Sequence, residues 1–209
     1  MARDKMVTRR KILDAVGRIL AREGSSKIGI NLIAKEAGID KVMIYRYFGS
    51  LEKLLIAFGE DQQVWPPLEL LLKKNTEPPK GNALEIAITG YLVNHLAEFR
   101  RDSIAKEITR WSLIDINALT NSISGEREKQ CKNLMNQLPF DQNVNPDMDL
   151  TAIISLLHAG ITQLVLNAKY SDYYMGIDLK SARGWKRIEV ALGELIKAYC
   201  FQKFARSSD

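Results

Sequence analysis

The amino-acid sequence predicts an all-α protein of about nine helices. Apolar residues recur every three or four positions along most of the 209-residue chain, which is the period of an α-helix. No β pattern of any length interrupts them. Between Asn31 and Leu54, two short helical patterns flank a turn at Gly38, and a further helix begins at Ser50. That arrangement is typical of a helix-turn-helix.

The positive charge of the chain is concentrated near its N-terminus. Residues 1–50 contain eleven Lys or Arg against five Asp or Glu, whereas the remaining 159 residues contain nineteen against twenty. A basic segment that overlaps a helix-turn-helix pattern favours a polyanionic partner over a merely solvated tail. The sequence therefore predicts double-stranded DNA as a partner.

The first helix is predicted over residues 7–22, with Gly24 ending it. Arg9 and Arg10 lie in its first turns, where the helix dipole disfavours cations. A nearby DNA phosphate would compensate for this arrangement, and so would solvent, so both interpretations remain open.

The second helix is predicted over residues 30–37 and the third, the recognition helix, over residues 41–47. Asp40 is a good N-cap for the third helix, and Ile44 and Phe48 should point inward. The remaining side chains would face outward, where apolar groups can meet thymine methyls and cations can meet phosphates. The candidate DNA-contacting residues are Arg9, Arg10, Asp40, Lys41, Val42, Met43, Tyr45, Arg46, Tyr47 and Lys53.

Residues 8–58 resemble the DNA-binding domain of the TetR family of bacterial one-component regulators. The resemblance rests on several spaced features: Ile33-Ala34, Ala37-Gly38-Ile39-Asp40, Ile44-Tyr45-Arg46-Tyr47-Phe48, Ser50, Glu52 and Leu54-Leu55. Two positions depart from the family pattern. Val42 stands where Gly is usual, and Leu51 stands where a phosphate-contacting Lys is common, with Lys53 as its candidate replacement.

The resemblance implies two domains. We expect a helix-turn-helix DNA-binding domain over residues 1–50 and an effector-binding and dimerisation domain over residues 51–209, with a fourth helix at 50–64 connecting them. Further helices are expected at 68–74, from Asn82 to Arg101, from Asp102 or Ser103 to about Asn117, and from about Ser124 to Leu138. The last two are expected from Pro146 to Tyr170 and from about Ser181.

The last two helices are predicted to form a homodimer interface. The segment at 146–170 is apolar almost all round and so needs partners on more than one side. In TetR-like proteins the last two long helices form a four-helix bundle with their mates, although packing within one chain would also use this surface. The candidate interface residues are Ile154, Leu157, Gly160, Ile161, Leu164, Ile188, Leu192, Leu195, Ile196 and Tyr199.

The middle helices would enclose the pocket for an unknown small-molecule effector. Candidate lining residues are Trp65, Tyr91, His95, Phe99, Trp111, Met135 and His158. Each of them could instead be a core residue. Their mixture suggests an apolar or aromatic effector, while a charged ligand paired with Arg100 or Arg110 is an alternative.

The predicted function is a DNA-binding regulator, with an effector-released repressor of a palindromic operator as the leading interpretation. An activator of the same fold and a non-enzymatic carrier are the alternatives. An enzyme is disfavoured because we find no nucleotide-binding glycine loop, no GxSxG motif and no cluster of metal ligands, so no cofactor and no metal are expected. The charged N-terminus and the lack of an eighteen-residue apolar run predict a cytoplasmic protein without a membrane partner. Cys131 and Cys200 are expected as reduced thiols.

Overall fold

The computed structural model describes residues 2–62, 66–72, 83–139 and 149–206. The fold is all-α, as predicted, and ten α-helices occur in these described ranges. By contacts the chain divides into two compact units: residues 1–65 with 102–129, and residues 66–101 with 130–209. The division into a DNA-binding and an effector domain is a functional one, and it remains a prediction.

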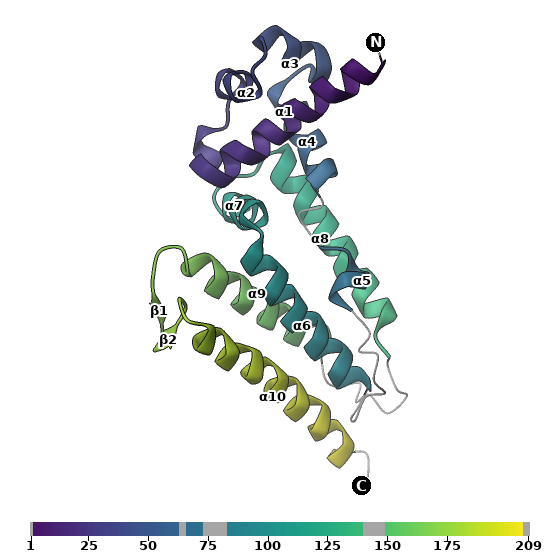
Figure 1. Ribbon diagram of the computed structural model, residues 1–209. Coiled ribbons are helices and arrows are strands. Elements are labelled where there is room, and N and C mark those ends of the chain that lie inside the picture. The colour runs from purple at the N-terminus through teal and green to yellow at the C-terminus, as the bar shows by residue number, and fades with distance from the viewer. Residues whose placement is uncertain (1, 63–65, 73–82, 140–148, 207–209) are drawn as a thin grey trace. The chain divides into compact units, whose positions relative to one another are not determined.

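The first unit is built around a long N-terminal helix (Figure 1). This helix, α1 (Ala2–Glu23), contacts α2 (Ile30–Ala37), α4 (Leu51–Gln62) and α7 (Ser103–Ser112), and α3 (Lys41–Phe48) contacts α2 and α4. The apolar stripe predicted for the first helix is buried at Ile12, Val16 and Ile19. The elements are α1 (Ala2–Glu23), η1 (Ser25–Lys27), α2 (Ile30–Ala37), α3 (Lys41–Phe48), α4 (Leu51–Gln62), α7 (Ser103–Ser112) and the first part of α8 (Ala118–Gln137).

The second unit is organised around α6 (Ala83–Arg101), which contacts α5 (Leu68–Leu71), α9 (Leu150–Asn167) and α10 (Ala182–Arg206). A short hairpin of β1 (Tyr173–Tyr174) and β2 (Ile177–Asp178) connects α9 to α10. This hairpin was not predicted. It turns through Met175 and Gly176, both at positive φ, and two-residue strands are too short to give an alternating pattern.

Several predicted helix boundaries were wrong. Helix α7 ends at Ser112 rather than near Asn117, and α9 ends at Asn167 rather than at Tyr170. The first helix starts at Ala2 rather than near residue 7. The eighth starts at Ala118 rather than near Ser124, because the Asn117 side chain accepts the amides of Leu119 and Thr120 and so caps it earlier. The ninth starts at Leu150, where the Asp149 carboxylate accepts the Ala152 amide. The expected starts of this helix at Pro146 and of α6 at Asn82 lie outside the described residues.

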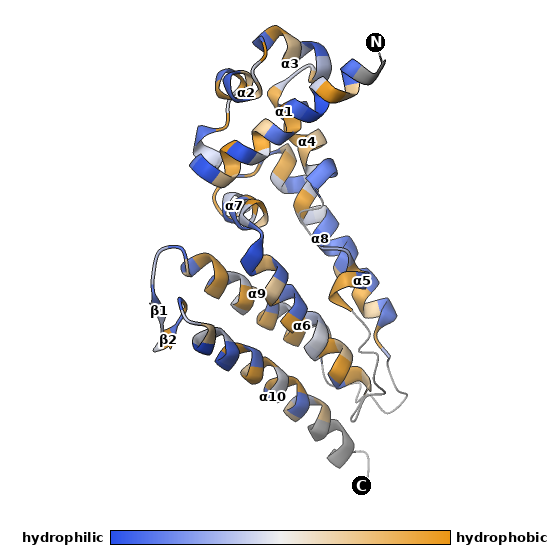
Figure 2. Ribbon diagram, viewed as in Figure 1, coloured by the Kyte–Doolittle hydropathy of each residue, from blue (hydrophilic) through white to orange (hydrophobic). Residues whose placement is uncertain are grey.

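Helix α9 is apolar along most of its length (Figure 2). Among the described residues it is the one helix whose length and mean hydropathy would suit a membrane span, yet only 22% of it is buried. Leu156 is 70% exposed on this helix. An exposed leucine on such a helix is typical of a surface that contacts another molecule.

Candidate nucleic-acid interface and effector site

Two local capping interactions fix the turn between α2 and α3. Gly38 adopts the left-handed conformation (φ 66°) that ends α2, and its amide bonds to the carbonyls of Ala34 and Lys35. The Asp40 carboxylate then accepts the Val42 amide at 2.8 Å and caps α3. Asp40 therefore has a structural task at the start of the recognition helix, whatever it contributes to DNA contact.

Helix α3 has a buried face and an exposed face, as predicted. Ile44 and Phe48 are buried and anchor the helix. On the other side Val42 is 63% and Tyr45 50% exposed. Lys41 and Arg46 are exposed as well, while Met43 and Tyr47 are half-buried. The exposed face thus combines apolar, aromatic and cationic groups on a rigid support.

Because α1 starts at Ala2, Arg9 and Arg10 lie about two turns into the helix, and both are engaged within the protein. The Arg9 guanidinium lies 5.6 Å from the centre of the Phe48 ring. Arg10 pairs with Asp61 at 2.9 Å and with Asp14 at 2.9 Å. Two carboxylates therefore compensate Arg10, so a phosphate is not needed to explain a cation in that turn.

The structure gives Lys53 an exposed position in the first turn of α4. Its amide bonds to the Ser50 hydroxyl at 3.1 Å, which confirms Ser50 as the cap of α4. Leu51 is half-buried. The lysine is thus free to extend from the surface, and its contact with a phosphate remains a prediction.

An ion-pair network that the sequence did not reveal joins α1 to α2. Glu36 pairs with Arg18 at 2.7 Å and with Arg22 at 2.8 Å. Hydrogen bonds from Arg22, and next from Arg18, lower the pKa of Glu36 to about 2. The partners are 14 and 18 residues apart, so no helical spacing signals them.

A buried carboxylate from α7 supports the connection between α1 and α2. Glu107 is 5% exposed, accepts the Ser25 amide at 2.6 Å and pairs with Arg110. Burial alone would raise the pKa of Glu107, but the hydrogen bonds from Arg110 and Ser25 hold it below its ordinary value. Glu107 lies 82 residues from Ser25, so no local sequence pattern signals this contact.

Four of the predicted effector residues come together in the second unit. Tyr91, His95 and Phe99 follow one face of α6, with ring centres 6.3 Å and 5.8 Å apart, and His158 of α9 stacks on His95 at 4.3 Å. Burial, and next the neighbouring His158, lower the pKa of His95 to about 3. Burial, and next Cys131, raise the pKa of Tyr91 to about 12. His95 and Tyr91 are therefore both uncharged near neutral pH.

The other three predicted effector residues are not part of this ring stack. Met135 is half-buried on α8. Trp111 belongs to the first unit, where its indole N–H donates to Asp115 at 3.1 Å. Trp65 lies outside the described residues. The ring stack is therefore the part of the predicted effector site that the structure brings together.

Half of the predicted dimer residues fill the core of their own unit. Gly160 and Leu195 are exposed, whereas Leu157, Leu164 and Ile188 are half-buried. The uncovered surface of α9 and α10 is instead carried largely by Leu156, Val190 and Leu195. The predicted residues that are buried within the unit are Ile154, Ile161, Leu192, Ile196 and Tyr199.

An all-α protein with a capped, outward-facing α3 after a tight turn is a helix-turn-helix protein. Residues 12–58 match the family described as bacterial regulatory proteins, tetR family. The chain is 28% identical over 103 residues to the HTH-type transcriptional regulator BetI of Brucella canis, covering 48% of this chain and 50% of that one. An HTH-type transcriptional regulator of Mycobacterium tuberculosis is 44% identical over 48 residues, covering 23% and 24%. The chain spans about half the length of the curated BetI relatives that it matches.

Solved structures share the whole fold. FadR from Bacillus subtilis, in complex with stearoyl-CoA, has a TM-score of 0.62 at 18% identity and covers 90% of this chain and 96% of its own. Salmonella enterica GusR has a TM-score of 0.60 at 20% identity and covers 91% and 95%. Residues 12–58 of this chain thus match the tetR family of bacterial regulatory proteins, and the fold of the chain resembles that of solved regulators.

Proposed function

We propose that this protein is a DNA-binding transcriptional regulator that reads DNA through α3. The observation that carries the proposal is the exposed face of α3, where Val42 and Tyr45 lie beside Lys41 and Arg46. Exposed Val and Tyr side chains on a short helix reduce solubility unless a partner covers them. The same groups suit thymine methyls, base edges and phosphates in a major groove.

The protein acts as a homodimer on a palindromic operator. One α3 can reach only a few base pairs, and two of them about 34 Å apart read a two-fold site. The uncovered apolar side chains Leu156, Val190 and Leu195 support a second copy as the partner of α9 and α10. Such a surface needs no membrane, and the protein is cytoplasmic in this proposal.

The regulator is a repressor that a small-molecule effector releases. The stack of Tyr91, His95, Phe99 and His158 supports an apolar or aromatic effector, because His95 and Tyr91 stay uncharged near neutral pH. FadR, which shares the fold, is known with bound stearoyl-CoA. Effector and operator weaken each other's binding by the same factor when each favours a different spacing of the two α3 helices. No catalytic step is assigned.

The test is footprinting of the purified full chain on the DNA that flanks its gene, with affinity measured by fluorescence anisotropy. We expect a footprint with two-fold symmetry and an affinity that falls steeply as salt rises, because released counterions drive binding. A carrier without DNA-binding function would show weak, symmetry-free binding. Absence of a protected site at low salt would overturn the proposal.

The effector is sought by titrating a panel of compounds into the preformed complex. Stearoyl-CoA, a free long-chain fatty acid and neutral aromatic compounds are the probes. Loss of DNA affinity with one of them supports release by an effector. If a probe binds the protein and leaves DNA affinity unchanged, that probe is not the releasing effector. Transcription in vitro from the same DNA separates a repressor from an activator.

A further inference from the structure

One face of α10 carries several cations and an acid, and only part of this charge is paired among the described residues. Six side chains of this helix border a hollow of about 340 Å³. The cations lie toward the start of the stretch and an acid lies toward its end, with two small apolar residues between them. The six residues are Arg183, Lys186, Arg187, Val190, Ala191 and Glu194.

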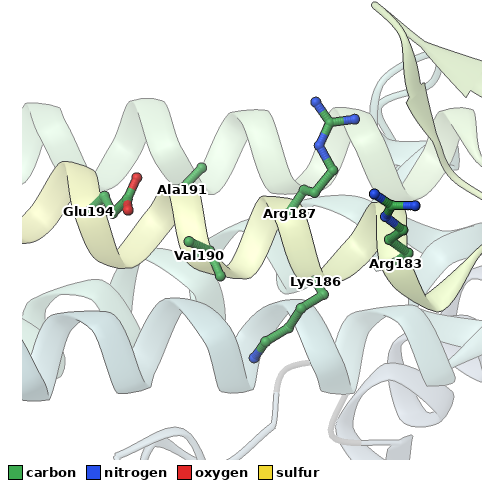
Figure 3. A pocket seen from close by; sticks show the side chains of 6 residues that line it. All are labelled: Arg183, Lys186, Arg187, Val190, Ala191 and Glu194. Atoms are coloured by element: carbon green, nitrogen blue, oxygen red, sulfur yellow. The ribbon is translucent and has the colours of Figure 1, made fainter.

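The charged groups at the two ends lie on the same side of the helix. Figure 3 shows Arg187 and Glu194 extending from one side of α10, whereas Lys186 extends from the other. Lys186 is engaged by Glu189 at 3.1 Å. Arg187 and Glu194 are seven residues apart and both exposed, and neither forms an ion pair with another described residue. Two opposite charges are thus presented outward and left without partners.

A parallel arrangement of two copies of α10 is disfavoured by these charges. In a parallel pair each residue would meet its own kind, so Arg187 would face arginine and Glu194 would face glutamate. An antiparallel pair places opposite charges together and also opposes the two helix dipoles. In a two-fold dimer every such contact occurs twice.

We propose that α10 pairs antiparallel with α10 of a second copy, about a two-fold axis between Val190 and Ala191. Arg187 of each copy then lies opposite Glu194 of the other, and Val190 lies opposite Ala191. This assignment rests on the proposed homodimer and defines its register. Arg183 faces Ala198 across the axis, so it has no charged partner there.

The test is a charge reversal at each end of the pair, with the dimer dissociation constant measured by analytical ultracentrifugation. We expect Arg187→Glu and Glu194→Arg each to weaken the dimer about tenfold or more, because both bridges become repulsive. The double variant R187E/E194R should return close to the wild-type value. Arg183→Glu is the matched control, and we expect less than a threefold change.

Mixing the two single variants separates pairing from misfolding. In a heterodimer of the R187E and E194R chains, both contacts are again between opposite charges, so native mass spectrometry should show the heterodimer in excess over either homodimer. A misfolded variant would not be rescued in this way.

The outcomes distinguish the register from the dimer itself. If the wild-type chain is a dimer and both single variants keep its dissociation constant, the register is wrong and the dimer stands. Failure of the double variant or of the mixture to recover affinity also overturns the register. A wild-type chain that is monomeric at every concentration overturns the proposed homodimer, and the pairing falls with it.

Discussion

Glu107 illustrates how a single residue far from the helix-turn-helix pattern supports it. Its carboxylate accepts the Ser25 amide and pairs with Arg110, and a Cβ on Gly24 would lie only 2.9 Å from the same oxygen. The link between α1 and α2 is therefore packed directly against this acid. Loss of one member of a buried, hydrogen-bonded group costs more than the bond itself, because the partners stay buried and unsatisfied.

Glu107→Ala should destabilise the protein by about 1–3 kcal/mol, because the Ser25 amide loses its acceptor in a buried position. Urea denaturation at pH 7 measures the free energy of unfolding. Glu128→Ala, on the exposed part of α8, is the control and should change it by less than about 0.5 kcal/mol. Equal effects of the two variants would contradict the supporting role of Glu107.

Because burial lowers the pKa of His95, we expect the protein to lose stability in mild acid. Its pKa is about 3 in the folded protein, against about 6.5 in the unfolded chain. Between these values the unfolded chain binds a proton that the folded protein does not, so the free energy of unfolding falls as pH is lowered from about 6.5 toward 3. The slope from this residue approaches about 1.4 kcal/mol per pH unit.

The measurement is urea denaturation between pH 7.5 and pH 5 for the wild type and His95→Phe. A phenylalanine keeps a ring in the stack between Tyr91 and Phe99 and cannot take up a proton. The variant should have the shallower dependence on pH. An unchanged slope would show that His95 does not bind its proton differently in the two states.

At the scale of the element, α3 is a helix whose two faces have different tasks. Its buried face, at Ile44 and Phe48, fixes it in the first unit, and the cap at Asp40 sets where it begins. The exposed face is therefore held rigidly, which favours contact with a partner that has a fixed groove.

Arg46→Ala should weaken operator binding by about 1–3 kcal/mol if Arg46 reads a base, with relaxed sequence preference at one position. If it contacts only a phosphate, affinity should fall for all sequences and the salt slope should drop by about one. Fluorescence anisotropy at several salt concentrations distinguishes the two. Arg127→Ala, which removes an exposed arginine of α8, is the control and should leave DNA affinity unchanged.

The start of α10 depends on a glycine for space. A Cβ on Gly184 would lie 1.7 Å from the Asp178 carbonyl oxygen, which is backbone and cannot rotate away. Gly184→Ala should therefore lower the free energy of unfolding by at least about 1–3 kcal/mol. Gly90→Ala is a matched control within α6, where a Cβ meets nothing within 4 Å. That variant should be neutral or stabilising by about 1 kcal/mol in thermal denaturation.

At the scale of the whole molecule, α9 connects stability to assembly. It is long and apolar, and only 22% of it is buried in the single chain. A second copy that covers it adds a free energy that depends on protein concentration. The midpoint of thermal unfolding should therefore rise as the protein is concentrated, and differential scanning calorimetry over a hundredfold range of concentration measures this. A constant midpoint in that range, together with a monomeric mass, would contradict a dimer.

The N-terminal helices could be predicted from the sequence because their determinants are local. Gly38 ends α2 and Asp40 begins α3 through bonds to residues no more than four positions away. The inward positions Ile44 and Phe48 follow from helical spacing in the same way. Boundaries were less predictable where two caps competed, as at Asn117 and Ser124, since either residue could begin the eighth helix.

An all-α chain with a helix-turn-helix, and the resemblance of residues 8–58 to the TetR family, could be predicted from the sequence, because period, caps and turn residues act over a few positions. Only the tertiary structure decided which residues meet across long separations, such as Glu107 with Ser25 and His95 with His158. It also decided that Leu192 and Ile196 fill their own core while Val190 stays exposed. Periodicity shows that a helix has an apolar face, but which element covers that face depends on packing in three dimensions.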